Sequence, residues 1–204
     1  MQNKKIILIC ATFVSLYLGL AFFFPNIFNP FWSKKNYHPK PKSYFRIDFP
    51  EKEYKSFDEN CPFNFEIPVY AYVVNKFKNA PKCYKTILLP TLKAELICTY
   101  SELDTDFIEK SEKLRSNAFK HSFRAASIKE RIHENFNKKV YGTIFEIEGN
   151  VACNYMFYLT DSLDHFFTGE LLFLARPNYD SLQPAIKFIK SDIEHLIESF
   201  EWKE

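Results

Sequence analysis

The sequence predicts an α+β fold in which a mostly antiparallel sheet is packed by two main helices and preceded by an N-terminal transmembrane helix. Two groups of segments alternate apolar and polar residues, which is the period of half-buried strands. Two other segments repeat apolar residues at spacings of three and four, as helices packed on one side do. Because the strands come in runs instead of alternating singly with helices, parallel crossover units are not expected.

Five strands are expected in the first half of the domain. In the first of them, Phe45, Ile47 and Phe49 alternate with more polar neighbours, and Pro50 ends the pattern. The second, around Phe63, has the same alternation before another proline. The five predicted strands are residues 44–49, 63–67, 69–75, 83–89 and 94–100.

A helix is expected next, because the apolar period changes after residue 104. Asp104 or Asp106 can cap its N-terminus, and Glu109 stands in its first turn, where a negative charge is favourable. The helix should run to about residue 121. Its inward face, spaced by four, three and four residues, consists of Phe107, Ser111, Leu114 and Ala118.

Four more strands and a final helix complete the domain. The predicted strands are residues 126–134, 139–148, 151–160 and 166–175. Gly149 provides a tight turn between the middle two. The last helix should begin near residue 178, with Asp180 or Ser181 as its cap and Pro184 in its first turn. Its apolar stripe is Leu182, Ile186, Ile189, Ile193, Leu196 and Phe200.

The N-terminal segment bears on the compartment. Residues 6–24 carry no charge and follow two lysines, and as a helix of about 1.5 Å per residue they are long enough for a bilayer. An uncleaved signal anchor fits this length, whereas a cleaved secretory signal would use the small residues around Ala21. A lipoprotein signal would acylate Cys10. We do not expect that lipidation, because bulky Ile9 precedes Cys10 and the apolar stretch before it is short.

Three parts of the chain follow from these patterns. Residues 1–24 are a signal anchor, residues 25–43 a tether rich in proline and lysine, and residues 44–204 a single domain. Prolines stiffen the tether and would hold the domain off the membrane. Two lysines and the amino terminus precede the apolar run and four lysines follow it, which by count alone would leave the domain in the cytoplasm. Those four begin ten residues beyond the run, however, so the positive-inside rule does not decide the orientation.

Composition excludes several classes of function. The chain of 204 residues has only 4 Gly, and no two of them form a G-x-G. The glycine-rich dinucleotide fingerprint and the P-loop are therefore absent. A net charge of +2, without a long basic stripe, gives no reason to expect a nucleic acid partner. The four glycines are Gly19, Gly142, Gly149 and Gly169.

The five cysteines fall into different groups. Cys98 and Cys153 lie on apolar strand faces and are expected to be small buried side chains. Cys61 and Cys83 each begin a strand after a polar turn. In an oxidising compartment we predict that these two form a disulfide, which would add about 3 kcal/mol of stability. In the cytoplasm both would be free thiols.

The search for chemistry finds no catalytic residue, cofactor site or metal site. No His-x-x-x-His or Gly-x-Ser-x-Gly spacing is present. Asp161, Asp164 and His165 could perform acid–base chemistry as a hydrolase, but we expect an ordinary turn between two strands. His195 is expected on the solvated side of the last helix. Glu146 and Glu148 share a strand face, for which solvent exposure is sufficient explanation.

Residues 37–54, 58–65 and 188–202 resemble segments of one family, that of the gliding motility lipoprotein GldD. The resemblance runs from Tyr37 to Lys203, and its most specific part is the C-terminal helix with the ending Ile-Glu-Ser-Phe-Glu-Trp. One departure concerns the acylated cysteine, which the family carries shortly before the Pro-Lys-Pro-Lys stretch and which residues 29–35 lack. The matching segments are residues 37–54, 58–65, 118–121, 139–142, 149–150, 157–162 and 188–202, together with Cys83.

The resemblance implies an envelope protein of gliding bacteria that is required for surface motility and associated with type IX secretion. On that basis we expect a non-enzymatic accessory protein that acts through protein–protein contacts. Its domain should face the periplasm, and the apolar N-terminal helix should replace the missing lipid anchor. Its partners should be the membrane and envelope proteins of the motility and secretion machinery.

Two alternatives remain open at this point. One is a periplasmic module that binds a small ligand or a lipid through aromatic residues on one sheet face. The other is a hydrolase that uses Asp161, Asp164 and His165. The arrangement of strands with a closing helix also resembles the PsbP/Mog1-like sandwich, which is an analogy of fold and implies no mechanism.

Overall fold

The computed structural model describes residues 2–23, 47–76 and 79–203. The chain divides into two compact units, Met1–Ser43 and Tyr44–Glu204. In the first unit, helix α1 (Gln2–Phe23) forms where the sequence predicts a helix. Among the described residues, however, no helix combines the length and apolar composition that crossing a membrane requires, so the predicted transmembrane helix is not supported. The predicted tether, residues 25–43, lies outside the described residues.

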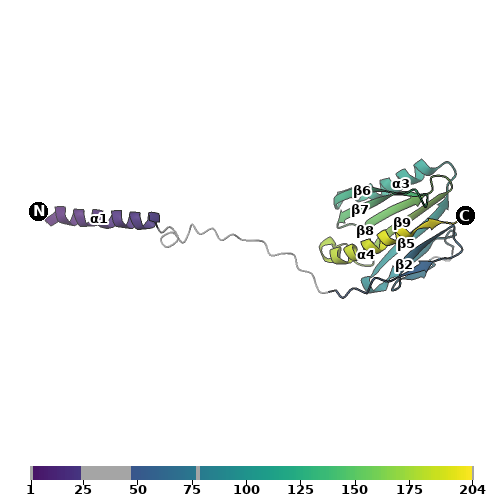
Figure 1. Ribbon diagram of the computed structural model, residues 1–204. Helices are drawn as coiled ribbons and strands as arrows, with labels where there is room; N and C mark the ends of the chain where they lie inside the picture. Colours follow the sequence, from purple (N-terminus) through teal and green to yellow (C-terminus); the bar gives the residue numbers. More distant parts are fainter. Residues whose placement is uncertain (1, 24–46, 77–78, 204) are drawn as a thin grey trace. The chain divides into compact units, whose positions relative to one another are not determined.

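The second unit is an α+β domain with two antiparallel sheets, which confirms the predicted fold class (Figure 1). The smaller sheet has the strand order β1-β2-β10, and the larger has the order β3-β4-β5-β9-β8-β7-β6. The strands are β1 (Tyr54–Phe57), β2 (Phe63–Pro68), β3 (Tyr72–Val74), β4 (Lys85–Leu89), β5 (Ala94–Glu102), β6 (Ala125–Asn135), β7 (Val140–Gly149), β8 (Cys153–Thr160), β9 (His165–Phe173) and β10 (Glu201–Trp202). The helices are α3 (Phe107–Phe119) and α4 (Tyr179–Ser199), with short 3-10 turns η2 (Pro90–Leu92) and η3 (Lys120–Phe123).

The first predicted strand is the largest difference from the sequence analysis. Residues 44–46 lie outside the described part of the chain, and residues 47–49 are not in a strand. The ring of Phe49 stacks instead on Phe188 of α4, with 4.4 Å between centroids. The apolar alternation of Ile47 and Phe49 therefore reflects the packing of the Phe49 ring on α4 and not a strand. Strand pairing begins only at Tyr54 in β1.

Several predicted boundaries also change, most clearly around Pro68 and at the start of α4. The strand expected at 69–75 is reduced to the three residues of β3, because Pro68 and Ala71 form a turn before it. Helix α4 is capped by Asn178, whose side chain accepts a hydrogen bond from the Ser181 amide, and not by Asp180 or Ser181. Pro184 consequently lies inside the helix instead of in its first turn.

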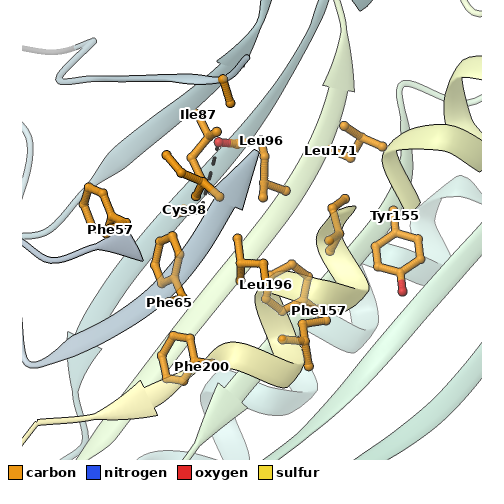
Figure 2. Packing of buried hydrophobic residues seen from close by; sticks show 14 of the residues in the cluster. Phe57, Phe65, Ile87, Leu96, Cys98, Tyr155, Phe157, Leu171, Leu196 and Phe200 are labelled. Carbon is orange, nitrogen blue, oxygen red and sulfur yellow. Dashed lines mark hydrogen bonds between the residues drawn. The ribbon is translucent and has the colours of Figure 1, made fainter. Parts of the chain in front are cut away.

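One face of the seven-stranded sheet packs against the three-stranded sheet and α4; we call it the α4 face. Figure 2 shows how rings and aliphatic chains from all three layers meet there. Phe167 of β9 contacts the rings of Phe63 and Phe65 from β2 and of Phe200 at the end of α4. The strands contribute Ile87, Leu96, Cys98, Ile144, Tyr155, Phe157, Leu159 and Leu171, and α4 contributes Ile189, Ile193, Leu196 and Ile197.

The opposite face of the sheet carries α3, and we call it the α3 face. Leu114 and Ala118 of the helix are buried against strand residues Phe145, Ile147, Cys153 and Met156. This cluster is separate from the one on the α4 face. Cys153 belongs to it although Tyr155, two residues on, points to the other face, because the pairing register of β8 shifts between them. Both Cys98 and Cys153 are buried, as the sequence predicts.

Candidate functional site

The segment that leads into β1 is held against helix α4 by side chains; we call residues 49–54, which end with the first residue of β1, the strap. Phe49 stacks on Phe188, and the ammonium of Lys52 lies 4.1 Å from the centroid of the same ring. The Lys52 ammonium also donates to the Phe188 carbonyl at 2.9 Å and to the Ser191 hydroxyl at 2.5 Å. The strap is thus held to α4 by the stacked rings of Phe49 and Phe188 and by several hydrogen bonds of the Lys52 ammonium.

The centre of this contact is Asp192, which is only 3% exposed. Its carboxylate accepts hydrogen bonds from Lys52 at 2.7 Å, from the Tyr54 hydroxyl at 2.9 Å and from the Tyr70 hydroxyl. Burial and the bond to Asp192 raise the pKa of Tyr54 to about 12 and raise that of Tyr70 further above its ordinary value. The tyrosines therefore remain donors over the whole physiological range.

His195, one turn further along α4, is not the purely solvated residue that the sequence predicts. Its ring stacks on Tyr54 with 3.6 Å between centroids, and its Nε2 lies 2.5 Å from a carboxylate oxygen of Glu66 on β2. Helix α4 is thereby linked to both β1 and β2. The side chain of His195 is half-buried in this arrangement.

A second polar site lies around His165, at the start of β9. The Tyr100 hydroxyl is 2.9 Å from His165 Nδ1, and the imidazole stacks on Trp202 with 5.0 Å between centroids. Two hollows of about 450 and 710 Å³ meet here, and both are lined by His165 and Lys203. We call them the His165 basin.

Charges of both signs line the His165 basin. Lys138 pairs with Glu201 at 3.0 Å, and Lys203 pairs with Asp58 at 2.5 Å, so each of these cations is already neutralised. Asp161 and Glu102 add negative charge, and Lys139 and Lys82 add positive charge. The basin is therefore polar, with no strong preference for the sign of a ligand.

The acid–base cluster suggested by the sequence is not assembled as a catalytic pair. Asp161 Oδ1 accepts the backbone N–H groups of Leu163, Asp164 and His165, at 3.0, 3.0 and 2.9 Å. Asp164 is exposed. The His165 ring is oriented by Tyr100 and not by a carboxylate. These contacts are those of a turn between β8 and β9, which is the alternative that the sequence analysis favours.

The remaining sequence candidates have structural surroundings. Glu146 pairs with Lys190 of α4 and Glu148 with Lys129 of β6, each at 2.8 Å, so neither is simply a solvent-facing carboxylate. In the described ranges, no group of three or more His, Cys, Asp or Glu could hold a metal ion.

A disulfide joins Cys61 and Cys83, whose Cα atoms are 5.7 Å apart. Cys61 precedes β2 and also lines the His165 basin. The bond links the loop between β1 and β2 of the small sheet to the turn before β4 of the large sheet. Cys10, where the sequence predicts no lipid, is exposed and carries no disulfide.

Together these features define an antiparallel α+β domain in which α4 and the small sheet cover one face of the large sheet and polar clusters join separate chain segments. The chain belongs to the family of the gliding motility lipoprotein GldD, whose pattern matches residues 34–202. This match covers most of the chain and confirms the resemblance seen in the sequence.

The chain is similar to the solution structure of cyanobacterial PsbP (CyanoP) from Synechocystis sp. PCC 6803, with a TM-score of 0.48 and 11% sequence identity. The alignment covers 75% of this chain and 94% of that protein. No curated protein matches the sequence.

Proposed function

We propose that the protein is a non-enzymatic accessory factor of the gliding motility and type IX secretion apparatus, acting through protein–protein contacts. Family membership supports its place in motility. The observation that carries the contact role is the exposure of apolar side chains around α3. Ile108 on the helix is 74% exposed and Ile132 on β6 is 72% exposed. Ile132 points to the same side of β6 as Glu130, which pairs with Arg115 of α3, so Ile132 lies on the α3 face. Ile108 lies on α3 itself.

The experiment is complementation of a deletion strain with full-length variants. The double change Ile108→Glu and Ile132→Glu should abolish colony spreading and reduce secretion while the protein accumulates normally, because charge is unfavourable in an apolar contact. Leu174→Glu is the matched control, since Leu174 is also an exposed apolar residue but lies beyond the end of β9. Normal spreading of the double variant would contradict a contact role for this face.

We further propose that the second unit, residues 44–204, is a single periplasmic domain of a membrane-anchored envelope protein. The Cys61–Cys83 disulfide supports this, because such bonds persist in oxidising compartments. Alkylation of thiols in intact cells should leave these two cysteines unmodified. A reduced pair in growing cells would argue for the cytoplasm instead. Absence of acylation at Cys10 is part of the same proposal, and palmitate labelling that is lost in Cys10→Ser would overturn that part.

A second candidate function is the binding of a small polar ligand, which the His165 basin favours. Its lining is polar, and the apolar cavity under α4 measures only about 20 Å³, too small for an acyl chain. Fluorescence of Trp202 can be isolated in the Trp32→Phe variant and followed during titration with N-acetylglucosamine and with glutamate. No change with either compound at millimolar concentration would count against this candidate. If neither compound binds, His165→Ala should leave colony spreading intact.

A further inference from the structure

The strap supplies most of the partners of a buried charge. Asp192 accepts hydrogen bonds from three side chains. Lys52 and Tyr54 belong to the strap, and Tyr70 belongs to the turn after β2. A carboxylate that is 3% exposed cannot exchange these donors for water without moving. If the strap left α4, Asp192 would keep only Tyr70 as a partner.

The same strap residues make other contacts that break together. Phe49 stacks on the ring of Phe188, and the Lys52 ammonium lies over the same ring. Tyr54 stacks on the ring of His195. The Glu53 carbonyl also accepts the Val69 amide at 2.8 Å. Since these groups follow one another along six residues, release of the contact at one end of the strap weakens the neighbouring contact along the chain.

The position of the strap in the chain gives these contacts a mechanical meaning. The strap leads into β1 and shares Tyr54 with it, and β1 pairs with β2 at an edge of the small sheet. β1 has only four residues. A pull that arrives from the N-terminal side therefore reaches Phe49 and Lys52 before it reaches the strand pairs of β1, the first of which joins Tyr54 to Pro68.

We propose that the strap is a mechanical latch, in which Lys52 and Tyr54 bind Asp192 and protect the domain from unfolding under tension on its N-terminal side. The inference rests on the proposed function in one respect, namely that an N-terminal anchor and partner contacts put the chain under load. The latch opens in one step, because its donors leave the buried carboxylate together. Once it is open, β1 is held by its pairs to β2, by the bonds of Lys55 to the Val69 and Ala71 carbonyls and by the buried ring of Phe57.

Hydrogen exchange of the full-length chain tests the latch without any motility assay. Asp192→Asn keeps the shape of the side chain but removes the charge and places an amide N–H₂ among donors. Amides of β1 should then exchange about tenfold faster or more, while those of β8 keep their wild-type rates. The matched control is Glu198→Gln, the same change of charge at an exposed position on α4, and it should leave β1 unchanged.

Three outcomes of that experiment would overturn the latch. One is unchanged exchange of β1 in Asp192→Asn, and another is an equal acceleration in Glu198→Gln. The third is a similar acceleration of β1 and β8, because it would assign Asp192 a general role in stability. Lys52→Met provides a second variant that leaves the buried carboxylate in place, and it should also accelerate exchange in β1 selectively.

Pulling on the two ends of the full chain measures the load directly. Wild type should show an early extension of about 3–4 nm, because the strap and β1 comprise about ten residues at about 3.4 Å each. In Asp192→Asn this step should occur at a clearly lower force, whereas the main unfolding force should change little. Equal forces for the early step in the two proteins would contradict the latch. Motility of these variants is a separate measurement, so the latch can fail while the proposed function stands.

Discussion

The two faces of the seven-stranded sheet are covered in very different ways. On the α4 face, a second sheet and a full helix bury aromatic rings such as Phe63, Phe167 and Phe200 almost completely. On the α3 face, a helix of 13 residues buries a small cluster and leaves Ile132 exposed. The α4 face therefore supplies most of the buried core, whereas the α3 face leaves apolar side chains exposed.

The largest expected effect compares the same substitution on both faces. Leu159→Ala on the α4 face should cost about 4 kcal/mol, because the fully buried side chain leaves a cavity that its neighbours cannot fill. Leu114→Ala on α3 should cost only about 2 kcal/mol, since the helix can settle toward the sheet. Denaturant unfolding of both variants measures the difference. Equal losses would contradict the division between the faces.

The disulfide is the next largest contribution on the α4 face, since both of its cysteines belong to that cluster. The double change Cys61→Ser and Cys83→Ser should lower stability by about 3 kcal/mol, because the open loop regains chain entropy in the unfolded state. Unfolding of wild type with a reducing agent provides the control. A reduced wild type that is as stable as the oxidised one would show that the bond is dispensable.

Alkaline pH should loosen the α4 face through Tyr54. Burial and Asp192 raise its pKa to about 12 from 10.0, so the folded protein holds this proton more tightly than the unfolded chain does. The stability that follows is complete below pH 10 and is lost as pH rises from about 10 to about 12. Tyr54→Phe should flatten this fall in pH-dependent unfolding curves, and Tyr72→Phe, at an exposed position, should not.

The smallest effect belongs to the α3 side of the sheet. Burial raises the pKa of Glu170 on β9, so its ionised form is penalised in the folded state. Glu170→Gln should therefore raise the melting temperature slightly at pH 7, and the gain should shrink as pH falls through the pKa of the carboxyl. Glu109→Gln, exposed on α3, is the control for the change of charge. A lower melting temperature for Glu170→Gln would contradict this view of the site.

Most of the elements could be predicted from local periodicity. The strands β5 to β9 and both domain helices follow alternation or three-four spacing, which depend on which side of an element is buried. The register shift in β8 escaped this logic. Buried Asn154 donates to the carbonyls of Ile147 and Gly149, and that local bonding moves Cys153 to the face opposite Tyr155.

The strap was not predictable in the same way. The alternation around Phe49 predicts a strand, because a ring that packs on a distant helix and a ring in a strand give the same pattern. Asp192 did leave a signal: it lies three residues after Ile189 and four before Leu196, on the edge of the apolar stripe. A carboxylate at such a position predicts buried partners, but their identity depends on contacts more than a hundred residues away.

The pairing of β10 with β2 has a consequence for biogenesis. Trp202 lies beside Phe63, and Lys203 bonds to Asp58 across a separation of 145 residues. A chain that emerges N-terminus first therefore cannot complete its small sheet until nearly all of the domain has followed. The Cys61–Cys83 bond spans only 22 residues and can close long before that. We expect this bond to form early in folding and to keep the loop before β2 close to the turn before β4 until β10 is available to pair with β2.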